Sequence, residues 1–431
     1  MPKITSAFTS SLLLNGHPIK KVKNKLREQY YTALRYIANQ CMHNKYSDCR
    51  LQQYRDYFKV NEPSDDIDGK SVTAQLIEHR LKPWRKKYCF MLICDAALVL
   101  ADRKKTAEAA KLISSLLSSD TSEFDKFADT LVKEDINAEK YPYAENLAKQ
   151  VLLNLRFADE EEKRFIISAN MSSGKSTLIN ALVGRRAART AQAACTGSLG
   201  MIYSKPFEDG KIHIDGKAPD FNAALKDITQ ADPSVSISSA MHFKRISGEC
   251  GRICFVDTPG VNSVLNRNHG EITRTALTDG KFDTLVFVFN ACKLGSDEEI
   301  GHLKWVKNTV PEEKTVFVVN KLDNFNASDD SISESINGVR NDLLQLGYKS
   351  PVICPVSAFF SLLVKKKLYG DTMSEDEIED YSCLARKFRR SAYDLSGYYE
   401  GAEITDEDSE ELQLSKKCGL YGLEQVLYGK R

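Results

Sequence analysis

The strongest chemical signal in the chain lies in residues 164–178, where a β-type apolar run leads into a loop of small residues and then a helical pattern. Backbone N–H groups in such a loop converge at a helix N-terminus and bind phosphate oxygens. Lys175 would reach the β- and γ-phosphates, and the Ser176 hydroxyl would bind Mg²⁺. The sequence therefore predicts a nucleoside triphosphate site made of Asn170, Met171, Ser172, Ser173, Gly174, Lys175, Ser176 and Thr177.

One position departs from the usual G-x-x-x-x-G-K-[ST] spacing, because Ala169 stands where the first glycine belongs. Alanine tolerates a positive φ poorly, so a slightly distorted turn is expected, whereas the phosphate-facing Gly174 is intact. A degenerate loop of this kind also arises by chance. The prediction therefore depends on further motifs.

A second phosphate-binding motif follows the apolar run at residues 252–256, in the sequence Asp257-Thr258-Pro259-Gly260. A carboxylate at the end of a strand can hold the hydration shell of Mg²⁺, and a glycine N–H can contact the γ-phosphate. We therefore expect Asp257 to serve the metal and Gly260 to sense the γ-phosphate.

Two later strand-like runs end in residues that suit a guanine base, namely Asn320, Lys321, Asp323, Ser357 and Ala358. The Asp323 carboxylate can accept both the ring N–H and the exocyclic amine of guanine, whereas adenine presents the wrong pattern. The small pair Ser357-Ala358 can place its backbone near guanine O6. Taken alone, residues 320–323 are equally consistent with an ordinary strand-end loop. The order of the four motifs, each after a strand-like run, favours a GTP site.

These motifs make residues 160–431 similar to the GTPase domain of the dynamin superfamily, and in particular to bacterial dynamin-like proteins. The loop has Ser172 where that family places a serine that coordinates a monovalent cation. Thr196 lies 21 residues after Lys175, at the position of the family's switch I threonine. Residues 257–266, followed by a helix-like segment from Glu271, complete the resemblance.

The resemblance implies an α/β P-loop GTPase domain with a mainly parallel sheet and helices on both faces. It implies GTP and Mg²⁺ as ligands, with a metal site formed by Ser176, Thr196 and Asp257. It also implies catalytic roles for Lys175, Ser172, Thr196 and Gly260, with K⁺ or Na⁺ near Ser172 in place of an arginine finger.

Two positions predict slow hydrolysis by the isolated chain. Ras-type enzymes carry a water-orienting Gln after the Asp-x-x-Gly motif, whereas Val261 has no hydrogen-bonding group, and eukaryotic dynamins carry Gln at the position of Met171. We therefore expect a GTPase switch that is stimulated when two GTPase domains associate. The alternative is a GTP-dependent protein-interaction module with negligible hydrolysis, which Val261 and Ala169 favour.

The length of 431 residues and the hydrophobic content of 42% predict two domains. Residues 1–160 have apolar positions at helical spacing, which predicts an all-α domain with helices at 26–37, 76–81, 90–100, 107–117 and 144–155. Residues 161–431 would form the GTPase domain, with a polar helical insertion at about 365–417. The expected final helix at 419–427 leaves no room for the stalk that dynamins carry after this domain. A further alternative is therefore half of a two-chain, membrane-associated system with a stalk-bearing partner chain.

Composition and charge bear on the expected partners and location. The net charge of +1 gives no global attraction to nucleic acid, so no nucleic acid partner is expected, and the basic patch at residues 17–27 is interpreted as the solvated start of a helix. The apolar stretch at residues 88–101 is interrupted by Asp95 and is too short to span a bilayer. Eleven scattered cysteines without a secretory signal predict a cytoplasmic protein, with membrane contact at most peripheral.

Overall fold

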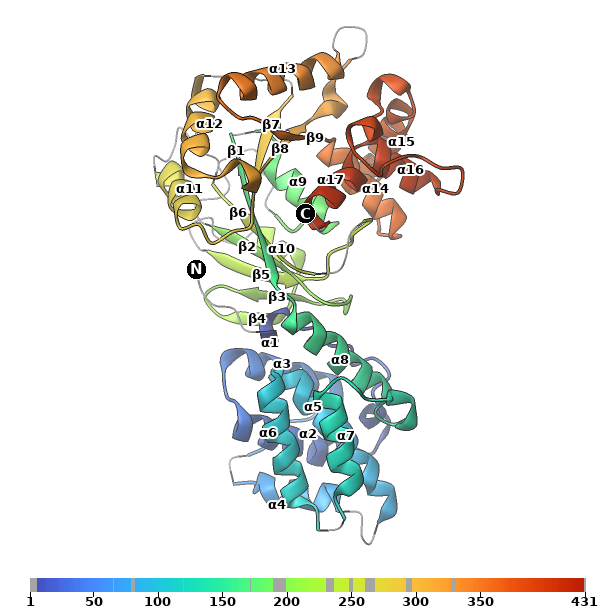
Figure 1. Cartoon of the computed structure of the whole chain (residues 1–431). Helices are drawn as coiled ribbons and strands as arrows, with labels where there is room; N and C mark the ends of the chain where they lie inside the picture. The colour runs from blue at the N-terminus through green and yellow to red at the C-terminus, as the bar shows by residue number, and fades with distance from the viewer. Residues whose placement is uncertain are drawn as a thin grey trace. The chain divides into compact units, whose positions relative to one another are not determined.

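The structure is a computed structural model that describes residues 6–64, 66–78, 82–118, 120–170, 172–188, 199–229, 236–247, 251–259, 268–291, 297–326 and 331–429. The chain forms two compact units (Figure 1). Residues 1–161 and 205–223 form the first, here called the helical unit. Residues 162–204 and 224–431 form the second, here called the sheet unit. The sequence places a single division at 160/161 and does not indicate that residues 205–223 group with the helical unit.

Every regular element described between residues 6 and 161 is helical, which confirms the predicted all-α region. The helices are α1 (Ser6–Thr9), α2 (Asn24–Cys41), α3 (Lys45–Phe58), α4 (Gly69–Ile77), α5 (Lys86–Leu100), α6 (Arg103–Leu116), α7 (Ser122–Val132) and α8 (Glu145–Asp159), with 3₁₀ turns at Pro18–Lys21, Pro83–Arg85 and Ala138–Lys140. Four predicted helices overlap α2, α5, α6 and α8, whereas α4 ends at Ile77, near the start of the predicted helix at 76–81. Within the described residues, no helix combines the length and apolarity needed to cross a bilayer.

Helix α3 is not among the helices predicted from the sequence, because a charged residue, Arg50, occupies a central position on its buried face. Tyr46, Arg50, Tyr54 and Phe58 follow one another at a spacing of four residues, and all four are buried. The Arg50 guanidinium donates to the Ser10 carbonyl oxygen at 3.0 Å. Arg50 also donates to Gln53 Oε1 at 2.7 Å. Since its two terminal nitrogens have partners, Arg50 can be buried where a pattern of apolar residues would be expected.

Helix α5 lies in the core of the helical unit, because every residue from Tyr88 to Leu100 is buried. A helix that is apolar on all faces requires neighbours on all faces. Asp95 is the carboxylate in this stretch, and none of its surface is exposed. Its two oxygens accept hydrogen bonds from Tyr30 Oη, from Tyr54 Oη at 2.9 Å and from His17 Nε2 at 3.0 Å. These three donors explain how a carboxylate can lie inside an apolar core.

His17 is buried, which corrects the interpretation of residues 17–27 as the solvated start of a helix. Helix α2 begins only at Asn24, and residues 18–21 form a 3₁₀ turn. The Ile19 N–H donates to His17 Nδ1 at 3.2 Å, so Nδ1 is an acceptor and the Nε2–H of the neutral ring donates to Asp95. The basic segment thus begins with a core contact, and Lys21, Lys23 and Lys25 further along it are exposed.

Replacing Asp95 by Ala is expected to destabilise the helical unit by about 3–5 kcal/mol, because three buried donors would lose their acceptor together. The measurement is urea denaturation of the full chain followed by circular dichroism, with the helical transition expected at a lower urea concentration. Asp129→Ala is the matched control, since Asp129 is exposed on α7 and forms a surface pair with Lys133, which is worth less than about 1 kcal/mol. Equal midpoints for the two variants would contradict the assignment.

Residues 205–223 form an antiparallel pair of strands within the helical unit, β3 (Ile212–Asp215) and β4 (Pro219–Ala223). The Asp209 carboxylate accepts from Lys205 Nζ at 2.6 Å and from the Leu12 N–H at 2.9 Å, and both charged side chains are fully buried. Burial lowers the pKa of Lys205 to about 8. Because Leu12 and Asp209 are 197 positions apart in the chain, no local sequence pattern indicates this contact.

The strands of the sheet unit have the order β5-β2-β6-β1-β7-β8-β9. They are β1 (Glu162–Ala169), β2 (Gly200–Ser204), β5 (Ile237–Met241), β6 (Arg252–Asp257), β7 (Thr284–Asn290), β8 (Thr315–Asn320) and β9 (Val352–Pro355). Their pairs are parallel except for the antiparallel pair of β2 and β6. The predicted α/β fold with a mainly parallel sheet is therefore confirmed.

Helices cover this sheet, and in Figure 1 α11 and α12 lie on one side of β1, β7 and β8 while α9, α14 and α17 lie on the other. The helices are α9 (Lys175–Val183), α10 (Leu225–Thr229), α11 (Asn268–Thr278), α12 (Asp297–Thr309), α13 (Ile332–Gln345), α14 (Ala358–Leu368), α15 (Glu375–Phe388), α16 (Glu410–Lys417) and α17 (Leu420–Tyr428). Strands β7 and β8 are buried almost throughout, as expected for parallel strands covered on both faces. The polar segment at 365–417 contains α15, α16 and two 3₁₀ turns, Ser391–Tyr393 and Ser396–Tyr398.

The parallel strands β1, β6, β7, β8 and β9 bring their carboxyl ends to one edge of the sheet. In open α/β sheets, ligands bind outside this edge. The predicted phosphate motifs follow β1 and β6, and the predicted base motifs follow β8 and β9. The fold therefore brings all four motifs to the same edge.

Candidate nucleotide-binding site

The phosphate loop leaves β1 without the distortion expected from Ala169. Ala169 is the last residue of β1 and pairs with Val288, so its backbone is extended and accommodates a methyl group. The left-handed conformations fall further on, at Ser172 with φ 63° and Gly174 with φ 86°. The departure from the usual glycine is therefore accommodated by the strand, and the expectation of a distorted turn at Ala169 is wrong.

Gly174 is required by a close approach as well as by its positive φ. A Cβ atom at this position would lie 2.3 Å from Nδ2 of Asn320, which no real contact allows. Helix α9 begins at the next residue, Lys175, with Gly174 as its N-cap. The loop therefore presents backbone N–H groups at a helix N-terminus, the arrangement that binds phosphate.

Lys175 and Asp257 lie side by side at the start of α9 and the end of β6. Lys175 Nζ pairs with Asp257 Oδ1, and the two side chains are only 9% and 6% exposed. The Thr258 hydroxyl donates to the Ile167 carbonyl oxygen at 2.8 Å, which fixes the residue after Asp257 against β1. An ammonium and a carboxylate held together here suit a phosphate chain and a divalent cation respectively, because each ligand carries the opposite charge.

Asn320 joins the phosphate loop to the base motif. Its Nδ2 donates to the Ser173 carbonyl oxygen at 2.9 Å, and its Oδ1 accepts from the Ala358 N–H at 3.0 Å. Only 2% of Asn320 is exposed, so both contacts lie in the interior. The residue thus fixes the spacing between the phosphate loop and the loop after β9.

Asp323 extends from a 3₁₀ turn, Leu322–Asn324, that follows Lys321 with φ 70°. The Ser357 hydroxyl donates to Asp323 Oδ1 at 2.6 Å, and Ser357 Oγ caps α14 by accepting from the Phe360 N–H. The structure therefore brings Asp323 and Ser357, which are 34 positions apart, into direct contact. Asp323 is half-buried.

The sequence analysis misses a residue that holds the Asp323 loop. Lys387 of α15 donates to the main-chain carbonyl oxygens of Asp323, at 2.6 Å, and of Phe325. A basic block at residues 386–390 was available as a signal, but a block of charges in a polar segment is more often a solvated helix face. Only the fold shows that one member of the block points to the base motif.

Some of the predicted site residues lie outside the part of the chain that the structure describes, and others are exposed or half-buried. Met171, Thr196, Gly260 and Val261 lie outside the described residues, and their roles stay predictions. Ser172 is exposed, and Ser176 and Thr177 are half-buried in the region where α9 begins.

The described residues fit a guanine nucleotide with Mg²⁺. The helix N-terminus after Gly174, the buried ammonium of Lys175 and the carboxylate of Asp257 suit a metal-bound triphosphate. At the other end of the predicted site, the Asp323 carboxylate would offer the acceptor that guanine needs.

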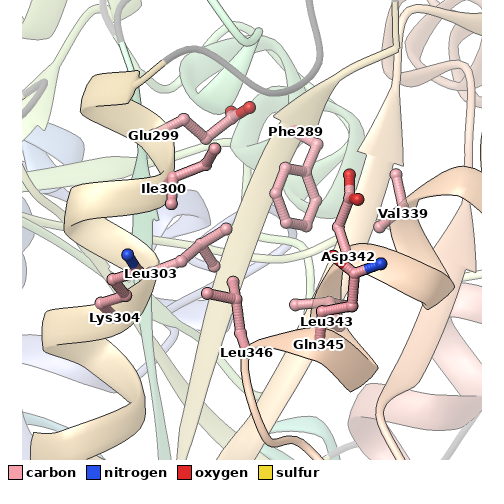
Figure 2. Close-up of a pocket in the computed structure, with 10 residues that line it drawn as sticks. All are labelled: Phe289, Glu299, Ile300, Leu303, Lys304, Val339, Asp342, Leu343, Gln345 and Leu346. Carbon is pink, nitrogen blue, oxygen red and sulfur yellow. The ribbon is translucent and has the colours of Figure 1, made fainter.

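A separate pocket of 470 Å³ lies between α12 and α13 over Phe289 of β7 (Figure 2). Figure 2 shows apolar side chains such as Leu303 and Leu343 around it, with the carboxylates of Glu299 and Asp342 on the two helices. Its described lining contains none of the predicted site residues. The pocket is therefore distinct from the loops at the carboxyl edge of the sheet.

Comparison with known proteins gives an independent indication of the family. Residues 167–322 match the model of the dynamin family. The chain is 26% identical over 228 residues to the probable transmembrane GTPase FZO-like, chloroplastic, of Arabidopsis thaliana. That match covers 51% of this chain and 22% of the relative, so the chain spans only 22% of that relative's length.

Solved structures that the chain resembles have low sequence identity and TM-scores below 0.5. Era from Aquifex aeolicus bound to GDP·AlF₄⁻ is 20% identical, with a TM-score of 0.30 over 50% of this chain and 58% of that chain. A chain of an oligomerised bacterial dynamin pair is 15% identical, with a TM-score of 0.35 over 89% of this chain and 70% of that chain. Toc33 from Arabidopsis thaliana, in complex with Mg²⁺ and GMPPNP, is 15% identical, with a TM-score of 0.29 over 57% of this chain and 79% of that chain.

Proposed function

We propose that this chain, which carries a dynamin-superfamily GTPase domain, binds GTP with Mg²⁺ and hydrolyses it to GDP and phosphate. The observation that carries the proposal is the position of Asn320, whose amide joins the phosphate loop at Ser173 to the base motif at Ala358. One buried side chain thus ties the phosphate loop to the loop that carries Ser357 and Ala358, at the edge of the sheet where a nucleotide would bind.

The phosphate end of the site would work as follows. Lys175 donates to the β- and γ-phosphates, and Ser176, Asp257 and Thr196 hold the metal. Bound Mg²⁺ would neutralise the charge that develops on the phosphate oxygens. The Thr196 carbonyl oxygen and the backbone around Gly260 orient the attacking water, a task for which Val261 has no polar group.

The exposed position of Ser172 within the phosphate loop supports two finer parts of the proposal. A K⁺ or Na⁺ ion near Ser172 would supply the positive charge that an arginine finger supplies elsewhere. Association of two GTPase domains across this face would exclude water and raise the rate. We propose self-association or a stalk-bearing partner chain, in the cytoplasm with membrane contact at most peripheral, and no nucleic acid partner.

The test is the GTP hydrolysis rate per molecule as a function of protein concentration, in K⁺ and in Li⁺ buffers, with ATP as the specificity control. The rate is expected to rise by about tenfold or more with concentration, to require K⁺ or Na⁺ and to be absent with ATP. Thr196→Ala should bind GTP normally and lose hydrolysis, because it lacks the metal-binding hydroxyl. Tight GTP binding with a flat, negligible rate would instead indicate an interaction module.

A further inference from the structure

We propose that Lys387 is a positioning residue that holds Asp323 in the conformation that reads guanine, so that the polar segment at 365–417 contributes to base specificity. This inference rests on the proposed function. It assigns a role to α15, which lies beside α14 in the sheet unit (Figure 1).

The base-reading loop, residues 320–325, contains the 3₁₀ turn Leu322–Asn324. Its 3₁₀ turn is short, and short helical turns end in carbonyl groups that have no partner within the turn. Lys387 Nζ donates to two of these carbonyl oxygens, those of Asp323, at 2.6 Å, and Phe325. The Tyr393 hydroxyl donates to the same Phe325 oxygen at 3.2 Å. The end of the turn is therefore fixed by donors from outside the loop.

The end of α15 that carries Lys387 is held in place by aromatic contacts. The next residue, Phe388, is fully buried and stacks on Phe360 of α14 with ring centroids 5.1 Å apart. The Lys387 ammonium also lies over the Tyr393 ring, 4.7 Å from its centroid. These contacts restrict the conformation of the Lys387 side chain before any ligand binds, so its contact with the base-reading loop costs little conformational entropy.

The start of α15 is held as firmly as its end. Ser374 and Glu377 form a capping box, and the Glu377 carboxylate pairs with Lys366 of α14 and with Arg186 at 2.9 Å. Helix α15 is thus attached at both ends to the elements that surround the predicted site. Movement of the helix would move Lys387 and, through it, the loop.

Asp323 is held at both its main chain and its side chain. Lys387 holds its main chain, and the Ser357 hydroxyl holds its side chain at Oδ1. Accepting two hydrogen bonds from one guanine edge requires the carboxylate to lie within about 0.5 Å of its productive position. In catalysis, a misplacement of about 1 Å can lower the rate by about 10²-fold. Fixing the residue from both sides supplies that precision.

A purely structural role for Lys387 predicts a different result from a positioning role. Inosine diphosphate, IDP, lacks the exocyclic amine of GDP but has the same phosphates, sugar and ring N–H. General damage to the site would weaken GDP and IDP equally. Misplacing Asp323 would weaken GDP more, because only GDP loses the bond from its amine. The ratio of the two affinities therefore reports the position of the carboxylate.

The experiment measures GDP and IDP binding to the full chain by calorimetry. The wild-type chain is expected to prefer GDP by about 10- to 100-fold, the contribution of one hydrogen bond to a carboxylate. Lys387→Met should reduce this preference to below about threefold, and Lys387→Arg, which can still donate to both carbonyls, should restore most of it. Arg389→Met is the control at the same helix end, where Arg389 forms a surface pair with Glu410.

Tyr393→Phe keeps the ring but removes the second donor to Phe325, and should lower the preference in the same direction by a smaller factor. It also serves as the test if Lys387→Met does not fold. A wild-type preference for GDP that survives in both Lys387→Met and Tyr393→Phe would overturn this inference alone. A wild-type chain that binds neither nucleotide would overturn the proposed function first, and this inference with it.

Discussion

Lys175→Ala is expected to lower the affinity for GTP by about 10²- to 10⁴-fold. The ammonium would donate to the β- and γ-phosphates, and each hydrogen bond between charged partners contributes about 1.5–3 kcal/mol. Lys175 is also 9% exposed at most, so water cannot readily replace it. Calorimetric titration of the full chain with a non-hydrolysable GTP analogue measures the loss directly.

The control for this variant has to separate lost binding from lost stability. Without Lys175, the buried Asp257 carboxylate has lost its cation, which destabilises the nucleotide-free protein as well. The melting temperature of each variant is therefore measured before titration. Lys349→Ala is the matched control, because Lys349 is an exposed lysine of the same unit. A folded Lys175→Ala protein with wild-type affinity would remove Lys175 from the site.

The carboxyl edge of the sheet could be predicted from the sequence because its signals are local. A β-type run followed by small residues and Lys175, or by Asp257, is visible within about ten positions, and parallel strands bring such ends together. The same reasoning assigns Asn320 and Ser357 to one site. In the structure, Asn320 contacts the phosphate loop at Ser173, and Ser357 contacts Asp323. Short-range patterns thus sufficed where the chemistry sits at strand ends.

The rest could not be predicted because it depends on contacts between distant residues. Asp95 interrupts an apolar helix, and only the folded unit shows that His17, Tyr30 and Tyr54 surround it. Arg50 interrupts the apolar periodicity of α3 for the same reason. A buried charge is tolerated only when it has hydrogen-bond partners, and the partner here, Ser10, lies far from Arg50 in the chain.

Asp323→Asn is expected to exchange guanine for xanthine as the preferred base. The amide Oδ1 can still accept from the ring N–H, but the new NH₂ group meets the exocyclic amine of guanine, donor against donor. Xanthine carries a carbonyl oxygen at that position, which the amide can donate to. We therefore expect GTP affinity to fall by at least about 10²-fold and affinity for xanthosine triphosphate, XTP, to rise by a similar factor.

The exchange would be measured by competition of GTP and XTP for the full chain. Asp342→Asn is the control, since it makes the same substitution at an exposed position of α13. The Ser357 hydroxyl, which donates to Oδ1 of Asp323, can donate to the amide oxygen as well, so it favours the orientation in which the NH₂ group faces the base. Equal losses of GTP and XTP binding would mean that Asp323 shapes the loop without reading the base. A gain for XTP alone requires direct contact, because no change in loop stability can prefer one exocyclic group over the other.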